Sequence, residues 1–251
     1  MRKDDRTPHA PYGRSRPGPS LQRWTRAVLR RPVRILWPVE VSGAHHVPAT
    51  GAAILCPNHL SFFDSVVMML TFDRPLYFIG KSEYLDSWKT RRLLPAMGMI
   101  PIDRDCGARA MIALDAAAAV LRDGSLLCIY PEGTRSRDGR LYRGYTGAAR
   151  LAATVGCALV PIGISGTEEI QPPDTRMPRF RRSCSVTVGE PLIPATASEE
   201  RRGGARTTTD ELMQRIAALT GQEYVPRHAT RVRQNTLVTE HLPRHLATAL
   251  G

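Results

Sequence analysis

The chain has 251 residues, of which 42% are hydrophobic and 23% are charged, and its formal net charge is +12. This length and hydrophobic content predict a folded protein with a sizeable core and exclude a disordered chain. The charge is unevenly distributed, because ten of the 35 Lys and Arg residues lie in the first 37 positions, against Asp4 and Asp5. A basic N-terminal segment of this kind favours an anionic partner, either a membrane surface or a nucleic acid.

The five cysteines are odd in number, and no C-x-x-C pair occurs. Cys56, Cys128 and Cys157 lie in apolar runs, so we expect small buried side chains in a reducing compartment rather than disulfides or a zinc site. No His/Cys cluster has metal spacing, and neither a metal nor a cofactor is expected. We also expect no signal peptide and no transmembrane helix, because the N-terminus is polar and the longest stretch that contains neither a charged residue nor His, 151–167, is broken by Gly and Pro.

The N-terminal segment divides into two parts. Residues 1–20 are rich in Pro, Gly and Arg and are predicted to be a disordered basic arm. Residues 21–37 predict an amphipathic basic helix that Pro32 should kink or split. One face carries arginines and the opposite face apolar residues, namely Arg23, Arg26, Arg30 and Arg34 against Leu21, Trp24, Val28 and Ile35. Such a helix can lie on an anionic bilayer, can pack its apolar stripe on the domain and leave its arginines in water, or can do both.

Apolar strand-like runs alternate with helical patterns from residue 38 to about residue 220. Strands are expected at 39–41, 52–56, 76–79, 99–102, 126–130, 158–164 and 185–188. Helices are expected at 62–70, 83–96, 108–121, 147–155 and 208–219, the last opened by a Thr208-x-x-Glu211 capping box. The alternation predicts a single α/β domain over 38–220, with a mixed, mostly parallel sheet flanked by helices. Residues 221–251 show no strong period and are expected to form a C-terminal tail.

The first candidate site follows the strand expected at 52–56, where Pro57 ends the strand and Asn58 and His59 come next. Ser61 can cap the following helix. Asp64 is five residues from His59, about 140° away on a regular helix, so the two side chains meet only if His59 precedes the first turn and folds back over it. The carboxylate could then fix one imidazole nitrogen and leave the other as a base. The alternative is a surface His beside an Asp that answers the helix dipole.

The second candidate site, Pro131–Ser136, directly follows the strand expected at 126–130. Catalytic groups of α/β proteins lie at this edge of the sheet. Arg135 offers a planar fork that can hold a phosphate through two hydrogen bonds, and Gly133 lets the backbone approach a ligand closely. The alternative is a Glu132–Arg135 surface pair of little energetic value. Asp103 and Arg104 end another short apolar run and could also flank an anionic ligand.

These stretches, in this order, resemble the motifs of the glycerolipid acyltransferases, the PlsC-like family of 1-acylglycerol-3-phosphate and lysophospholipid acyltransferases. Asn58-His59 with Asp64 is similar to the N-H-x-x-x-x-D motif of that family. The second, third and fourth motifs are resembled by Gly98–Arg104, Pro131–Arg135 and Val160–Ile162. The resemblance covers about residues 39–192 and implies a glycerol-3-phosphate acyltransferase-like fold.

The resemblance also implies a role for each residue. His59 would be the general base, and Asp64 would orient and stabilise its imidazolium. Arg104 and Arg135 would hold the acceptor's phosphate, in a site shaped by Glu132, Gly133 and Thr134, while Val160 and Pro161 would support a substrate pocket. The chemistry agrees, because a positioned base accelerates attack by an alcohol by about 10²–10⁴-fold. Cys56 is a conceivable nucleophile, but strand alternation and Pro57 should point it into the core.

The implied reaction is transfer of a fatty acyl group from acyl-CoA or acyl carrier protein to the hydroxyl of 1-acylglycerol-3-phosphate, giving phosphatidic acid in phospholipid synthesis. The enzyme would be cytoplasmic and peripheral on the inner face of the cell membrane, with residues 21–37 on the anionic lipid surface. Two alternatives stay open: the same mechanism on another lysophospholipid, a glycolipid or an amino-lipid, or a non-catalytic lipid- or nucleic-acid-binding protein. No specific nucleic-acid partner is expected, because no recognised nucleic-acid module is visible.

Overall fold

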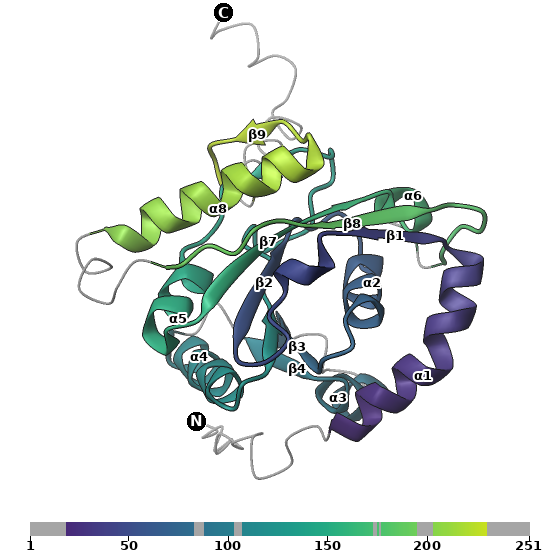
Figure 1. The fold of residues 1–251 in the computed structure, drawn as a ribbon, viewed down its shortest axis with the longest axis horizontal. Coiled ribbons are helices and arrows are strands. Elements are labelled where there is room, and N and C mark those ends of the chain that lie inside the picture. The colour runs from purple at the N-terminus through teal and green to yellow at the C-terminus, as the bar shows by residue number, and fades with distance from the viewer. Residues whose placement is uncertain are drawn as a thin grey trace, which may run out of the picture.

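The computed structural model describes residues 19–82, 88–102, 107–172, 175, 177–194 and 203–229. Within these residues a seven-stranded sheet has the order β1-β8-β7-β2-β5-β3-β4 (Figure 1). All neighbouring strands are parallel except β7 and β8, which are antiparallel. The strands are β1 (Val39–Ser42), β2 (Ala53–Pro57), β3 (Leu76–Lys81), β4 (Met99–Ile102), β5 (Leu126–Cys128), β7 (Ala158–Ser165) and β8 (Cys184–Val188). The predicted α/β fold with a mixed, mostly parallel sheet is therefore confirmed.

The centre of the sheet is formed by the most continuously apolar runs of the sequence. Every residue of β2 is buried, and β2 lies between β5 and β7. Its register pairs Leu55 with both Cys128 and Val160. A parallel strand covered on both faces needs an unbroken apolar run, and this is the pattern that identified β2, β5 and β7 from sequence.

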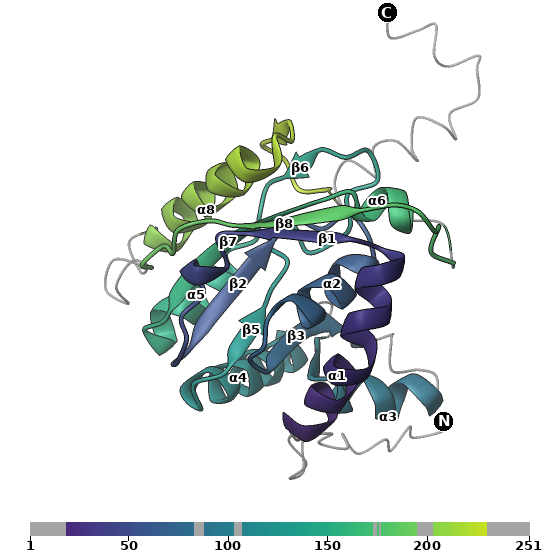
Figure 2. The ribbon, with the colours of Figure 1, turned by 45° about the vertical axis from the view of Figure 1, so that its right-hand side comes forward.

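Helices cover both faces of the sheet (Figures 1 and 2). One face is covered by α4 (Gly107–Arg122), α5 (Gly147–Val155) and α8 (Gly204–Thr220), which share one apolar core with the sheet. The other face carries α1 (Pro19–Leu36), α2 (Phe63–Thr71) and α6 (Thr167–Ile170). The remaining elements are α3 (Trp88–Ala96), the short helix η1 (Ala44–His46), and a two-stranded parallel pair, β6 (Leu141–Tyr142) with β9 (Tyr224–Val225).

The C-terminal third differs most from the sequence-based prediction. Helix α8 begins at Gly204, so Thr208 lies inside it and the predicted capping box is wrong. The threonines inside this helix do not need a capping position, because a hydroxyl can bond within the helix. Thr209 does so by donating to the carbonyl of Ala205, one turn earlier. Residues 224–225 pair with β6, so the segment after Gly221 is part of the fold. Of the disordered arm predicted at 1–20, residues 19–20 belong to α1, so that part of the prediction is wrong, and residues 1–18 lie outside the described residues. The rest of the tail at 230–251 and the first part of the helix expected at 83–96 also lie outside them.

Helix α1 is one helix with Pro32 inside it, so Pro32 does not split it. Its polar face packs on the domain. The Gln22 side chain donates to the carbonyls of Leu76 and Met97, both at 2.7 Å, and accepts the Leu76 N–H. The Arg26 guanidinium is buried and donates through Nη1 to the carbonyls of Phe72 and Arg74. Burial lowers the pKa of Arg26.

The apolar stripe of α1 consequently faces solvent. Trp24 is 70% exposed and Ile35 is 78% exposed, with Leu21 and Val28 also exposed. The interpretation in which this stripe packs on the domain is therefore wrong. The second tryptophan, Trp37, behaves differently, because it is buried against the domain.

Replacing Arg26 with Ala should lower the free energy of unfolding by about 1–3 kcal/mol, because the buried carbonyl of Phe72 and the partly buried carbonyl of Arg74 lose their donor. Arg23→Ala, on an exposed position of the same helix, should leave it unchanged. Urea denaturation followed by circular dichroism measures both variants. Equal midpoints for the two variants would contradict the anchoring role of Arg26.

Candidate active site

The two predicted site stretches lie next to each other because they follow adjacent parallel strands. Strands β2 and β5 pair in register, and their carboxyl ends lead into the segments that carry His59 and Glu132. The backbone joins these segments, since the Ser136 N–H donates to the His59 carbonyl at 2.7 Å. The sheet edge where α/β proteins build their sites is therefore the edge that carries both motifs.

His59 folds back over the first turn of α2, as its spacing from Asp64 requires. Its Nδ1 lies 2.8 Å from Asp64 Oδ2. The same carboxylate oxygen accepts the backbone N–H groups of Leu60 and Ser61, at 2.7 and 2.9 Å. The Asp64 side chain is fully buried, whereas the His59 side chain is 17% exposed. With Nδ1 held by the carboxylate, Nε2 is the nitrogen that can take a proton from a substrate.

The other oxygen of Asp64 has a partner that the sequence analysis missed. Asp64 Oδ1 accepts the hydroxyl of Thr167, the first residue of α6, and both side chains are fully buried. Gly166 precedes it with a φ of 87°, and a Cβ there would overlap the carbonyl of Ser183. No sequence signal marked Thr167, because it is 103 residues from Asp64 and lies in a short helix.

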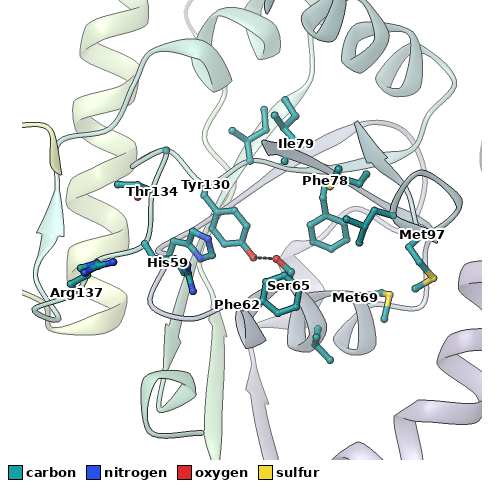
Figure 3. A pocket seen from close by; sticks show the side chains of 17 residues that line it. His59, Phe62, Ser65, Met69, Phe78, Ile79, Met97, Tyr130, Thr134 and Arg137 are labelled. Atoms are coloured by element: carbon teal, nitrogen blue, oxygen red, sulfur yellow. Dashed lines mark hydrogen bonds between the residues drawn. The ribbon is translucent and has the colours of Figure 1, made fainter. Parts of the chain in front are cut away.

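Tyr130 supports the imidazole from its face. The rings of Tyr130 and His59 are stacked, with centroids 3.8 Å apart and planes at 19° (Figure 3). The Tyr130 hydroxyl is hydrogen-bonded to Ser65 Oγ at 2.9 Å. Burial raises the pKa of Tyr130, so its phenol stays protonated. The His59 imidazole is thus fixed at one edge by Asp64 and over one face by Tyr130.

Glu132 acts within the protein rather than in the cavity. Its carboxylate is buried and accepts the backbone N–H groups of His59 and Tyr142, at 3.2 and 2.9 Å. Burial raises the pKa of Glu132 to about 8, against the opposing effect of these two donors. Glu132 is absent from the residues lining the cavity described below, so it shapes the site by holding the His59 backbone.

Asn58 connects the site to the C-terminal segment. Its side chain is fully buried and exchanges hydrogen bonds with the backbone of Ile164 on β7. It also donates to Gln222, whose own amide donates to the Gly139 carbonyl. Residues just after α8, treated as a tail from the sequence, therefore support the segment that carries the base.

A cavity of about 330 Å³ opens beside His59 (Figure 3). Near His59 its walls include Gly133, Thr134 and Arg135, all predicted site residues, together with Arg137, which the prediction omitted. The rest of the wall is mostly apolar and comes from α2, β3, α3 and β4, with Phe62, Val66, Met69, Phe78, Ile79, Leu94, Met97 and Met99. One end of the cavity thus offers cations and a base, and the other end offers hydrocarbon contacts.

Other predicted residues lie elsewhere. Arg104 lies outside the described residues. Val160 and Pro161, expected to support a substrate pocket, are buried in β7 with Ile162 and do not line the cavity, so they pack the core. Cys56 is fully buried and burial raises the pKa of its thiol, which excludes it as a nucleophile for the cavity. Among the described residues, no group of three or more His, Cys, Asp or Glu side chains could hold a metal ion.

Comparison with known proteins identifies the family. The Acyltransferase family matches residues 38–165, half of the chain, and the chain belongs to this family. A chloroplastic 1-acyl-sn-glycerol-3-phosphate acyltransferase, LPAT1 of Arabidopsis thaliana, is 31% identical over 155 residues, covering 61% of this chain and 43% of that protein. A 1-acyl-sn-glycerol-3-phosphate acyltransferase of Borreliella burgdorferi is 28% identical over 129 residues, covering 51% of this chain and 52% of that protein.

The solved structures agree on the fold. The crystal structure of the 1-acyl-sn-glycerophosphate (LPA) acyltransferase PlsC from Thermotoga maritima matches with a TM-score of 0.56 at 21% identity, covering 77% of this chain and 82% of that chain. The chain spans about half the length of the curated relatives named above. These comparisons confirm the resemblance drawn from the motifs.

Thr167→Val should lower kcat of the acyl transfer proposed below by about tenfold or more, with little change in KM. The reason is that the buried carboxylate of Asp64 loses a hydrogen bond. Thr167→Ser retains the hydroxyl and should restore most of the rate. Steady-state kinetics of the three proteins measures this. Equal rates for the Val variant and the wild type would show that Asp64 does not depend on Thr167.

Glu132→Ala should lower the free energy of unfolding by about 1–3 kcal/mol, because two buried N–H groups lose their acceptor. It should also lower kcat, since the backbone of His59 is released. Glu190→Ala, at an exposed position after β8, is the matched control and should behave as wild type. Thermal denaturation and kinetics of both variants decide whether Glu132 supports the site.

Proposed function

We propose that the protein is an acyltransferase that moves a fatty acyl group from a thioester, acyl-CoA or acyl carrier protein, to the hydroxyl of 1-acylglycerol-3-phosphate, giving phosphatidic acid in phospholipid synthesis. One observation carries the proposal. An Asp-paired His, held at 2.8 Å, lies where an apolar cavity meets Arg135 and Arg137. The curated relatives that share the family bear the name of this activity.

The reaction needs one proton acceptor and one proton donor, and His59 can serve as both. Nε2 of His59 accepts the proton of the acceptor hydroxyl as its oxygen attacks the thioester carbonyl carbon. Asp64 stabilises the imidazolium that forms. When the tetrahedral intermediate collapses, the carbon–sulfur bond breaks and the imidazolium returns the proton to the leaving thiolate. The new ester and the free thiol leave, and His59 is neutral again.

The two ends of the cavity match the two parts of the substrates. The wall formed by Phe78, Met97 and their apolar neighbours suits a hydrocarbon chain. Arg135, together with Arg104 from the resemblance, would hold the phosphate of the acceptor, and Arg137 adds a further cation at the same end. Gly133 and Thr134 line this end, and Gly133 has a φ of 73°, which favours glycine over other residues.

We also infer that the protein is peripheral on the inner, cytoplasmic face of the cell membrane, with α1 on the anionic lipid surface. The exposed stripe of Trp24, Val28 and Ile35 would enter the lipid interface, and the exposed arginines Arg23, Arg31 and Arg34 would meet the headgroups. Within the described part of the chain, no helix has the length and apolar character needed to cross a membrane.

The first test is thiol release from acyl-CoA with and without 1-acylglycerol-3-phosphate. Wild type should release thiol only when the acceptor is present, and His59→Ala should lose about 10²–10⁴-fold of this rate while its circular dichroism stays unchanged. Acyl carrier protein is the second donor to test. Wild-type turnover retained by a folded His59→Ala variant would contradict the proposed mechanism.

The phosphate assignment predicts a selective effect of Arg135→Ala. KM for 1-acylglycerol-3-phosphate should rise about tenfold or more, because a charge-assisted hydrogen bond is lost, whereas turnover of a phosphate-free acceptor should not change. Arg122→Ala, at the exposed end of α4, is the control. An equal loss with both acceptors would place Arg135 elsewhere in the mechanism.

A further inference from the structure

The segment Met177–Arg182, which connects α6 to β8, presents apolar and basic side chains together to solvent. Met177 is 76% exposed and Phe180 is 65% exposed. Between and beside them, Arg179, Arg181 and Arg182 are also exposed. Large apolar side chains left in water and surrounded by cations are typical of segments that enter a lipid interface.

This segment adjoins the C-terminal end of α1. The Trp37 indole N–H donates to the Arg179 carbonyl at 2.8 Å, and the Trp37 and Phe180 rings are stacked with centroids 5.6 Å apart. In Figures 1 and 2 the connection between α6 and β8 lies beside the end of α1. The segment therefore lies beside the C-terminal end of α1, where Ile35 and Leu36 are also exposed.

The same connection is attached to the active site. The Arg179 N–H donates to the carbonyl of Ile170, the last residue of α6, at 2.7 Å. The following carbonyl, that of Gln171, accepts the Ser61 hydroxyl at 2.6 Å. Ser61 directly precedes Phe62, which lines the cavity and is 48% exposed. A lipid surface that binds Met177–Arg182 would therefore lie close to residues 59–62, which lead from His59 into α2.

We propose that Met177–Arg182 is a second membrane contact, which binds anionic phospholipid bilayers together with α1 and holds the cavity at the lipid surface. The proposal rests on the proposed function, since it supplies the surface from which a lysophospholipid acceptor would enter. Met177 and Phe180 would enter the interface, and Arg179 and Arg181 would meet lipid phosphates. The single acidic contact among the described residues of this segment, Glu169 to Arg182 at 3.7 Å, is exposed and leaves the segment with net positive charge.

Binding to the lipid is tested by flotation of the full chain with vesicles of phosphatidylglycerol and phosphatidylethanolamine. Met177→Ser should weaken binding about fivefold or more through lost apolar contact. Arg181→Glu should weaken it by at least as much, because each charge near an anionic surface contributes about a fivefold effect. Neither substitution replaces a residue of the Trp37–Phe180 stack. Ile193→Ser, at an 87% exposed position after β8, is the matched control and should bind as wild type.

A kinetic comparison separates this proposal from the proposed function. Turnover of a short-chain, water-soluble 1-acylglycerol-3-phosphate should be the same in the variants and the wild type. Turnover of the acceptor presented in vesicles should fall with the loss of binding. Wild-type flotation of both Met177→Ser and Arg181→Glu would overturn the membrane contact, whatever the catalytic result. Absent turnover in the wild type would instead count against the proposed function, while the flotation result would still decide the membrane contact.

Discussion

The site depends on one buried carboxylate. Asp64 is fully buried, and its carboxylate accepts hydrogen bonds from the N–H groups of Leu60 and Ser61, from Nδ1 of His59 and from the hydroxyl of Thr167. A buried carboxylate without such donors would cost several kcal/mol, so the loop after β2 must fold to supply them. The need to satisfy this one group therefore determines the path of the loop and the position of the base. It also makes α6, far away in the sequence, part of the structure that holds Asp64 and His59.

Further hydrogen bonds connect the loop that carries His59 to distant parts of the chain. Glu132 joins the loop after β5 to the His59 backbone, and Gln222 joins Asn58 to the segment after α8. On the other side, Ser61 is bonded to the carbonyl that follows α6. The segment Met177–Arg182 follows this carbonyl in the chain and contacts Trp37 just after α1. The two proposed lipid contacts are therefore connected to the segment that carries His59.

The sequence predicted the sheet and the His59–Asp64 pair because their signals are local. Continuous apolar runs indicate parallel strands, and the five-residue spacing lets His59 and Asp64 meet in one geometry only, with His59 before the first turn of the helix. Thr167 and Gln222 carry no such signal, since their roles arise from contacts over more than 100 residues. For a related reason the sequence could not decide which face of α1 packs on the domain. Its periodicity indicates two faces, but it carries no sign of the carbonyls of Phe72 and Arg74, to which Arg26 donates and which hold the face with Arg26 against the domain.

The most direct test of this account is the turnover of Asp64→Asn in the thioester assay. The amide keeps the size of the side chain but has no negative charge. It therefore cannot accept the three hydrogen bonds from Leu60, Ser61 and His59 and also stabilise an imidazolium. The account predicts that the folded variant loses about 10²–10⁴-fold in kcat, comparable with loss of the base itself. A folded Asp64→Asn protein with a rate near that of the wild type would show that the carboxylate is not what makes His59 a base.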